Sequence, residues 1–210
     1  MFDISSQELK LPKVRLISFK RFIDERGFFT EPYRESDIRN LGEGFENFKV
    51  VQVNESRSPG NIIRGLHFQW NPYMGKLVRP LQGTLFEVLL DIRKDSPTFG
   101  KTIIVKISRN VKDEFDNWLW SPPGIAHGFF CLEETVMEYL CTGEYTKKFE
   151  ATINPLSEDI DWSLADPELY DIYKGVLGNQ PILSERDLAG YSVKGWSESP
   201  DSDNFLFANL

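Results

Sequence analysis

Residues 76–92 read KLVRPLQGTLFEVLLDI, and this stretch decides the fold. It holds two short β-type runs, Lys76 to Leu81 and Thr84 to Ile92. Gln82-Gly83 stands between them, and a glycine between two such runs is a turn signal. The stretch therefore predicts two consecutive strands separated by a turn.

The second run alternates between two faces. Its positions 86, 88, 90 and 92 are all apolar and are expected to face a core. The opposite face mixes Leu85 and Leu89 with Glu87 and Asp91. Such a face fits an interior that encloses a polar ligand, and it fits a solvated outer surface equally well. Periodicity alone leaves both interpretations open.

Short runs of the same kind fill the chain from about residue 48 to residue 142. Turn signals separate them at Ser96-Pro97, at Ser121-Pro122-Pro123-Gly124 and at Glu133-Glu134. The gaps are too short for the crossover helices that parallel strands need. We therefore expect an antiparallel β-sandwich or barrel. The remaining runs are Phe48 to Val53, Thr102 to Ser108, Ile125 to Leu132 and Thr135 to Cys141.

After Trp162 the sequence changes character. Asp166-Pro167 is a helix start, and an amphipathic pattern continues over Glu168 to Val176 until Gly178. Residues 191–210 are mostly polar and are expected to be mobile unless their apolar side chains dock. We expect one domain over residues 1–190, followed by a polar C-terminal extension over residues 191–210.

Composition bounds the function. The chain has 210 residues, of which 40% are hydrophobic, and a formal net charge of −8 at pH 7. A sizeable core is therefore expected. The negative charge argues against general nucleic-acid binding, so any phosphate site must be local. The chain has no long apolar run, and its N-terminus lacks the features of a signal peptide, so we expect a cytoplasmic protein without membrane contact.

Two cysteines and two histidines limit the chemistry. Cys131 and Cys141 are too few for a disulfide framework, and reduced, buried thiols are expected. With His67 and His127 alone, a metal site of three or more imidazoles is impossible, although mixed ligation by histidine and carboxylate stays open. A metal cofactor is therefore disfavoured.

The densest polar segment beside a β run is RGLHFQ, residues 64–69. In an extended strand Arg64 would lie on one face and His67 on the other, beside the gap left by Gly65. A substrate or another backbone can approach there. A lone strand histidine is more often a structural hydrogen-bonding group than a catalyst. A strand tyrosine such as Tyr139 usually packs with its hydroxyl at the rim.

Several motifs are spread over about residues 15–162: DERGFF (24–29), QVN (52–54), RGLHFQ (64–69), GKLVR (75–79), DIRKDSPTFG (91–100) and PGIAHGF (123–129). Three stretches in this order, RGLHFQ, DIRKDSPTFG and PPGIAHGF, form a highly specific signature. Taken together, these motifs resemble one family, the dTDP-4-dehydrorhamnose 3,5-epimerases. These are cofactor-independent enzymes of deoxysugar biosynthesis on a cupin-type jelly roll.

The resemblance implies an all-β fold, a cupin-type antiparallel β jelly roll or barrel with short peripheral helices, and catalysis without a cofactor or a metal. It implies that His67 is the general base, oriented by Asp187, and that Tyr139 is the acid on the opposite face of the sugar. Removing a proton next to a 4-keto group gives an enolate, and Lys76 resembles the residue that stabilises it. If the register of the strand that carries Tyr139 slipped by one residue, Leu140 would stand in place of the acid.

The same resemblance implies a nucleotide-sugar pocket in a homodimer. The base is expected among Arg26, Phe29 and Glu31 of a partner subunit. Tyr145 resembles the residue that stacks on the base, and Arg64 is expected on the diphosphate. The other expected pocket positions are Gln52, Asn54, Lys76, His127, Glu150 and Arg186.

The leading interpretation is inversion at C3 and C5 of a dTDP-linked 4-keto-6-deoxyhexose. The nearest enzymatic alternatives are inversion at C3 only and action on a GDP- or CDP-linked sugar. Arg186 stands where a lysine is usual, a change that keeps the charge and alters the geometry. A catalytically silent sugar-nucleotide-binding cupin is the alternative from another class. A metal-dependent cupin oxygenase is a distant third because the histidines are too few.

Overall fold

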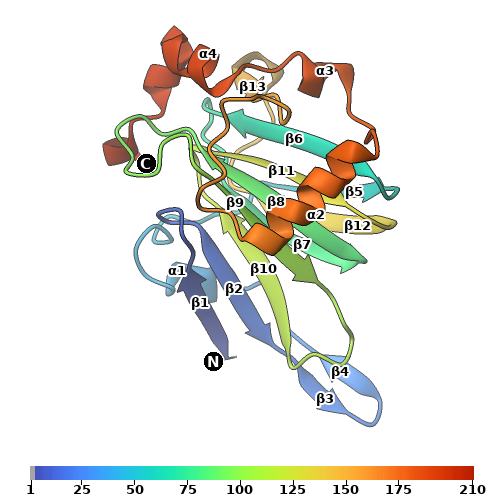
Figure 1. Ribbon diagram of the computed structural model, residues 1–210. Coiled ribbons are helices and arrows are strands. Elements are labelled where there is room, and N and C mark those ends of the chain that lie inside the picture. The colour runs from blue at the N-terminus through green and yellow to red at the C-terminus, as the bar shows by residue number, and fades with distance from the viewer. Residues whose placement is uncertain (1–2) are drawn as a thin grey trace.

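The computed structural model of the protein describes residues 3–210, most of them in strands and the loops between strands (Figure 1). The strands are β1 (Ile4–Glu8), β2 (Arg15–Lys20), β3 (Phe22–Asp24), β4 (Gly27–Phe29), β5 (Gln52–Ser58), β6 (Ile62–Gln69), β7 (Lys76–Gln82), β8 (Thr84–Asp91), β9 (Thr102–Ser108), β10 (Phe115–Ser121), β11 (Ile125–Cys131), β12 (Thr135–Cys141) and β13 (Glu150–Thr152). The α-helices are α1 (Glu35–Arg39), α2 (Pro167–Gly178), α3 (Glu185–Leu188) and α4 (Val193–Glu198). Short 3₁₀ helices lie at Lys147–Phe149, Pro200–Asn204 and Phe207–Asn209.

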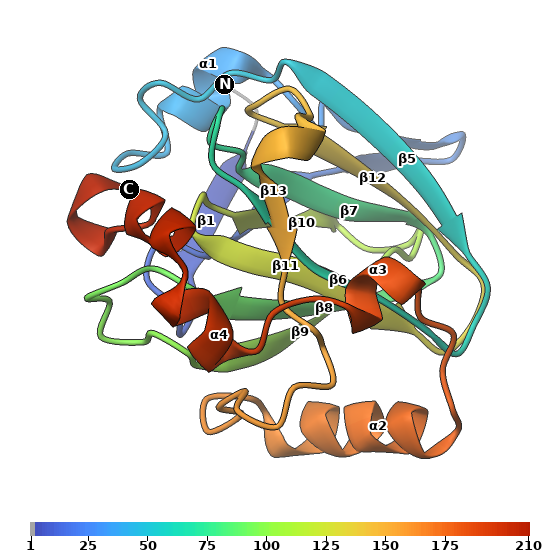
Figure 2. The ribbon, with the colours of Figure 1, turned by 90° about the horizontal axis from the view of Figure 1, so that it is seen from above.

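Two antiparallel sheets pack face to face (Figures 1 and 2). The six-stranded sheet has the order β1-β2-β10-β7-β12-β5, and the five-stranded sheet has the order β13-β6-β11-β8-β9. β3 and β4 form a separate two-stranded hairpin. The predicted all-β fold, a cupin-type antiparallel jelly roll with short peripheral helices, is confirmed.

The Gln82-Gly83 turn carries the chain from one sheet to the other. β7, before the turn, pairs with β10 and β12, whereas β8, after it, pairs with β9 and β11. Gly83 has a φ of +79°, and a Cβ there would lie 2.7 Å from the carbonyl oxygen of Glu134. Only glycine fits this crossing. The two consecutive strands of residues 76–92, β7 and β8, therefore belong to opposite sheets.

Both faces of β8 are buried. Glu87 and Asp91 are fully buried, so the solvated interpretation of their face is wrong and the interior interpretation is correct. On that face Leu89 packs with Leu119 of β10, and Leu85 packs with residues of β7 and β12 in the other sheet. The apolar face of β8 packs instead against α2 and against residues 191–210. Fully buried carboxylates between two sheets indicate a polar interior.

Residues 191–210 fold onto the outer side of the five-stranded sheet. Trp196 and Phe205 are fully buried, and the Trp196 ring lies edge-on to Phe68 of β6 at a centroid distance of 4.6 Å. The Lys94 backbone N–H donates to the Phe205 carbonyl at 2.7 Å. The apolar side chains of the extension therefore dock. α2 begins as predicted, because the Asp166 side chain accepts hydrogen bonds from the first-turn N–H groups.

The outer side of the six-stranded sheet is covered by the segment that contains α1. Phe48 was expected to open a strand, but it turns into this outer cluster, where its ring lies 5.3 Å from that of Trp120. The strand begins only at Gln52. β10, which the run pattern did not predict, carries Trp118 and Trp120 into the same cluster. In this cluster the contacts are made largely by aromatic rings, so the alternation of apolar and polar residues that marks a strand is weak in β10.

Three further observations complete the fold. Both cysteines are buried and unpaired, as expected. No helix within residues 3–210 is long and apolar enough to cross a bilayer. β3 and β4 project beyond the end of the six-stranded sheet (Figure 1), and we call residues 22–29 the β3–β4 arm.

Candidate active site

A cavity of about 500 Å³ opens between the two sheets. Its walls come from β5, β7 and β12 on one side and from β6 and β13 on the other, with α3 at the rim. Nine residues expected in the site from the sequence line it: Gln52, Asn54, Arg64, His67, Lys76, Tyr139, Tyr145, Glu150 and Arg186. Residues that are far apart in the sequence thus converge on one polar hollow.

His67 and Asp187 form a hydrogen-bonded pair at the edge of the cavity. His67 Nε2 lies 2.7 Å from Asp187 Oδ1, and the Asp187 side chain is 4% exposed. Asp187 is placed by α3, which is capped by Ser184, and it also accepts from the Gly65 N–H at 3.3 Å. Burial opposes ionisation, but the His67 hydrogen bond and these N–H contacts outweigh it and lower the pKa of Asp187. A carboxylate on one ring nitrogen leaves the other nitrogen of His67 available for a substrate proton.

A β-bulge brings Arg64 and His67 to the same cavity, which corrects the expectation that they lie on opposite faces. His67 pairs with His127 of β11 and Arg64 pairs with Phe129, so two residues of β6 oppose one of β11. Gly65 lies in the bulge with a φ of +120°. A Cβ at Gly65 would lie 2.5 Å from a backbone atom of β11, so glycine is required.

Tyr139 faces the cavity from the opposite sheet. Its neighbours in register are Asn54 of β5 and Val78 of β7. Burial raises the pKa of Tyr139 above its ordinary value, so its hydroxyl keeps its proton at neutral pH. Leu140 points the other way into the outer cluster and is 5% exposed. The side chain presented to the cavity is therefore that of Tyr139.

Lys76 adds a buried ammonium group beside Tyr139. Its Nζ lies 6.0 Å from the centroid of the Tyr139 ring. Burial lowers the pKa of Lys76, and the negative charges of Glu150 and Glu87 act in the opposite direction. An ammonium group that is partly withdrawn from water interacts more strongly than one in bulk water with a negative charge that develops beside it.

His127 does not line the cavity, although it was expected as a pocket residue. It lies behind the wall, where its Nε2 is 2.6 Å from Glu87 Oε2. Burial lowers the pKa of His127, although Glu87 acts to raise it. Glu87 is fully buried on β8 and was missed as a site residue. Its signal in the sequence was an acidic residue on an interior face, which periodicity could not separate from a surface residue.

The rim of the cavity carries an ion pair. Arg186 Nη2 lies 2.5 Å from Glu150 Oε1, which links α3 to β13. The exposed Tyr145 is held by its backbone N–H, which donates to Gln52 Oε1 at 2.8 Å. Two neighbouring hollows of about 450 and 380 Å³ share Arg186 with the cavity. The combined space is long enough for a ligand larger than one sugar ring.

Three expected site residues lie apart from this cavity within the chain. Arg26 is at the tip of the β3–β4 arm, where its side chain is 85% exposed and pairs with Asp24. Phe29 is also exposed on the arm, and Glu31 pairs with Arg34. The arm points away from α3 and β13, which border the cavity (Figure 1). Residues that line the cavity and were not expected are Glu55, Ser56, Phe68, Gln69 and Met74.

Comparison with known proteins identifies the family. Residues 8–194 match the family model described as dTDP-4-dehydrorhamnose 3,5-epimerase. The chain is 40% identical over 167 residues to the dTDP-4-dehydrorhamnose 3,5-epimerase of Shigella flexneri, an alignment that covers 77% of this chain and 88% of that protein.

Two solved structures are similar over most of their length. One is the dTDP-6-deoxy-D-glucose-3,5-epimerase of Legionella pneumophila in complex with dTDP-4-keto-L-rhamnose, with a TM-score of 0.78, 31% identity, and coverage of 97% of this chain and 98% of that one. The other is a 3'-monoepimerase of Streptomyces bikiniensis in complex with dTDP-quinovose, with a TM-score of 0.72, 26% identity, and coverage of 90% and 88%. On the family model and this identity to a curated relative, the chain belongs to the dTDP-4-dehydrorhamnose 3,5-epimerase family.

Proposed function

We propose that this protein inverts C3 and C5 of a dTDP-linked 4-keto-6-deoxyhexose, the reaction of a dTDP-4-dehydrorhamnose 3,5-epimerase. One observation carries the proposal. His67, paired with Asp187, lies on the five-stranded sheet, and Tyr139 lies on the six-stranded sheet across the same cavity. Inversion of a carbon requires that a proton leave one face and return to the other, and two opposed proton-transfer groups meet that need.

In the proposed mechanism His67 is the general base. It removes the proton from a carbon next to the 4-keto group, and the electron pair moves onto the keto oxygen as an enolate. The Lys76 ammonium group stabilises that negative charge. Tyr139 returns a proton from the opposite face, and the keto group re-forms. Proton removal and return are redox-neutral, so the proposed reaction uses no oxidant or reductant.

Binding of the nucleotide is assigned to the rim and to a second subunit. Arg64 and Arg186 offer positive charge to a diphosphate in an otherwise acidic protein. Tyr145 is proposed to stack on the base. In a homodimer, Arg26 and Phe29 of the arm, with Glu31 close behind, would complete the pocket of the other subunit. Sedimentation at assay concentration should give the mass of a dimer, and a fully active monomer would contradict this assignment.

A single-centre reaction is the second candidate. It is favoured by the similarity to the Streptomyces bikiniensis 3'-monoepimerase. Both reactions use the same base and differ in whether the C5 proton is also exchanged.

The cytoplasmic location expected from the sequence stays a prediction.

Proton NMR separates the candidates. The protein is mixed with dTDP-4-keto-6-deoxyglucose in D₂O, and the C3 and C5 proton signals are followed separately. Loss of both signals, with the appearance of inverted product, is the expected result. Exchange at C3 alone would support the monoepimerase, and exchange at neither carbon would overturn both candidates.

A further inference from the structure

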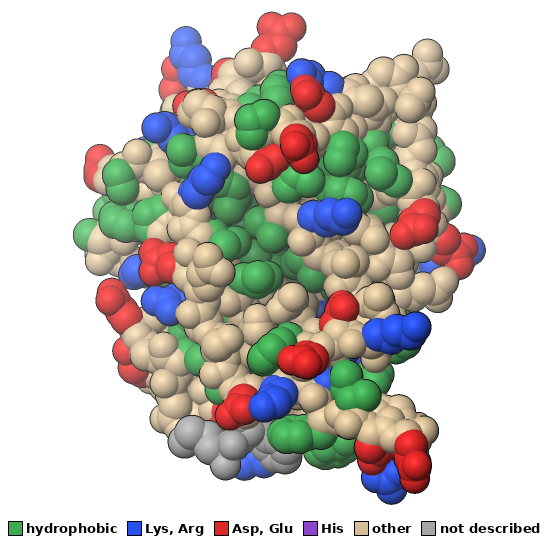
Figure 3. Space-filling view, turned by 60° about the horizontal axis from the view of Figure 1, so that its bottom comes forward, with side chains coloured by type: hydrophobic (Ala, Val, Ile, Leu, Met, Phe, Trp, Pro, Cys, Tyr) green, Lys and Arg blue, Asp and Glu red, His purple; other side chains and the backbone are tan. Residues whose placement is uncertain are grey.

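The β3–β4 arm needs an anchor. Its two strands pair with each other and belong to neither large sheet, and a lone two-stranded hairpin is marginally stable in water. In the space-filling view the arm stands out from the body with hydrophobic side chains behind a charged tip (Figure 3). Ile23 and Phe29 are among its exposed apolar residues. A segment of this shape keeps one orientation only if its root is fixed.

Arg21 lies at that root, between β2 and β3. Its side chain is 1% exposed, and its Nη2 donates to Asp116 Oδ1 of β10 at 2.7 Å. Its guanidinium carbon lies 4.6 Å from the centroid of the Phe28 ring on β4. Arg109 approaches the same ring at 6.0 Å. One buried cation therefore joins the arm to the six-stranded sheet through an ion pair and through a cation–π contact.

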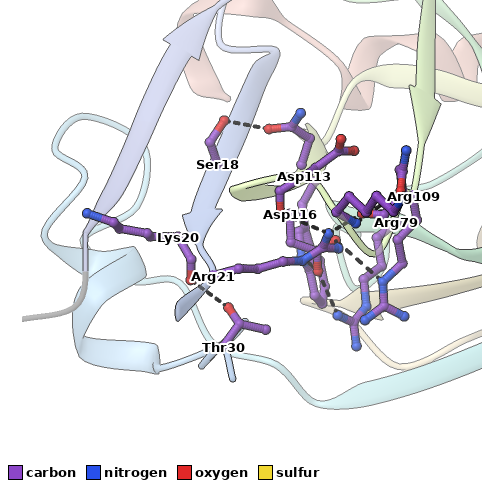
Figure 4. A network of polar contacts seen from close by, with 12 residues as sticks. Ser18, Lys20, Arg21, Thr30, Arg79, Arg109, Asp113 and Asp116 are labelled. Atoms are coloured by element: carbon purple, nitrogen blue, oxygen red, sulfur yellow. Dashed lines mark hydrogen bonds and ion pairs between the residues drawn. The ribbon is translucent and has the colours of Figure 1, made fainter. Parts of the chain in front are cut away.

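The Asp116 carboxylate lies among several cationic side chains (Figure 4). Its Oδ2 accepts from Arg79 Nη1 at 3.0 Å and from Trp118 Nε1 at 3.3 Å. Its Oδ1, besides binding Arg21, lies 3.6 Å from Arg109 Nε. Asp116 itself is 3% exposed. A single buried carboxylate thus lies next to three guanidinium groups, from the residue between β2 and β3, from β7 and from the loop after β9.

The same contacts reach the strand that carries Tyr139. Arg79 donates from Nε and Nη2 to Glu138 Oε1 at 3.1 and 2.9 Å, and Glu138 directly precedes Tyr139 on β12. We call Arg21, Arg79, Arg109, Asp116 and Glu138 the Asp116 network. It contains three positive and two negative charges. Loss of Asp116 would leave three cations facing one carboxylate, and the Arg21 side chain among them is 1% exposed.

We propose that Asp116 is a positioning residue, which fixes the root of the β3–β4 arm to the six-stranded sheet through Arg21. The role of the arm in substrate binding rests on the proposed function, in which the arm of one subunit completes the pocket of the other. Asp116 lies outside the cavity and does not touch the reacting atoms. Its effect on turnover therefore acts through the position of Arg26 and Phe29.

Hydrogen–deuterium exchange of the purified full-length protein tests the anchor without reference to activity. In Asp116→Asn, exchange of residues 22–29 should rise about tenfold, while β7 and β12 exchange as in the wild type. Phe28→Leu removes the ring between the guanidinium groups, keeps an apolar side chain, and should give a smaller rise in the same segment. Ser18→Ala is the matched control, because it breaks the 2.6 Å Ser18–Asn117 hydrogen bond between β2 and β10 outside the network. It should leave the arm unchanged.

Steady-state kinetics tests the consequence. KM for the nucleotide sugar should rise about fivefold in Asp116→Asn with kcat within about twofold of the wild-type value, since binding changes and the chemical groups do not. Unchanged arm exchange in both variants, or an equal rise throughout the six-stranded sheet, would overturn the anchor. Faster arm exchange with an unchanged KM would uphold the anchor and instead contradict the proposed place of the arm in a partner's pocket.

Discussion

The two walls of the cavity differ in how they place a proton-transfer group. His67 sits on a bulged strand and receives its carboxylate from Asp187, 120 residues further along the chain. Tyr139 sits on β12 beyond the register shift at Val136/Met137, and its neighbours Asn54 and Val78 face it in the ordinary strand register. A carboxylate orients the base, whereas burial keeps the acid protonated. The base wall therefore depends on tertiary contacts, and the acid wall depends on the sheet itself.

Among the substitutions that test this comparison, removal of the base should have the largest effect on activity. His67→Ala should reduce exchange at both C3 and C5 by about 10⁴-fold, at the upper end of what a general base contributes, because no other imidazole lines the cavity in residues 3–210. The measurement is the loss of the C3 and C5 proton signals in D₂O. Binding of dTDP serves as the control for an intact fold. A mild and equal loss at both carbons would remove His67 from its role.

Removal of the carboxylate alone should cost less. Asp187→Asn leaves the imidazole in place but no longer fixes its tautomer, so kcat should fall about 10²-fold with KM nearly unchanged. Asp201→Asn, which changes an exposed carboxylate elsewhere in the C-terminal segment, is the matched control. If Asp187→Asn retained full activity, the long-range contact of the base wall would be structural only.

The charge of Lys76 on the acid wall can be weakened from the opposite sheet, which carries Glu87 on β8. Glu87 is buried near Lys76 and His127 and raises the pKa of both groups. Glu87→Gln should lower the pKa of Lys76, so the ammonium form would be lost at a lower pH. We expect about tenfold less activity at the alkaline end of the kcat profile, because less of Lys76 is then in the ammonium form. Glu158→Gln, an exposed change, should leave the profile where it is. An unshifted profile in Glu87→Gln would show that Glu87 does not control Lys76.

The smallest expected effect is on stability. The pKa of Asp187 is lowered in the folded protein, so Asp187 stabilises the fold above the unfolded-state pKa of about 3.9, and that contribution is lost as the pH falls through the folded-state value. The Tm difference between wild type and Asp187→Asn should therefore shrink below about pH 4. A Tm difference that persists undiminished below that pH would contradict a stabilising role of the ionised Asp187 carboxylate.

The sequence predicted individual strands better than the contacts between them, for a physical reason. Strand alternation over β8 and β12 is local, so these strands and the residue types on each of their faces could be predicted from spacing. The bulge at Gly65 could not, because it depends on the approach of β11. Asp187 was reached only through family resemblance. Glu87 stayed undecided because alternation does not distinguish an interior face from a surface.

The sequence alone does not predict whether residues 191–210 dock, because docking also depends on contacts between distant parts of the chain. Polar residues dominate residues 191–210, and the few apolar side chains gain burial only from the covered face of β6 and β8. The network at the root of the arm was not predicted at all. Arg79 and Asp116 lie on two different strands, Arg21 lies between β2 and β3, and the three residues have no shared motif.

Tyr139→Phe tests the central claim most directly, because that claim is that the two walls act on opposite faces of one carbon. The variant is incubated with dTDP-4-keto-6-deoxyglucose in D₂O beside Tyr170→Phe, which removes a tyrosine hydroxyl on α2, outside the cavity. Proton exchange at C3 and inversion are measured in the same NMR time course. We predict that Tyr139→Phe continues to exchange the proton while inversion falls about 10²-fold, because abstraction needs His67 and return from the other face needs the hydroxyl. Inversion at the wild-type rate, or exchange lost together with inversion to the same extent, would contradict the two-wall account.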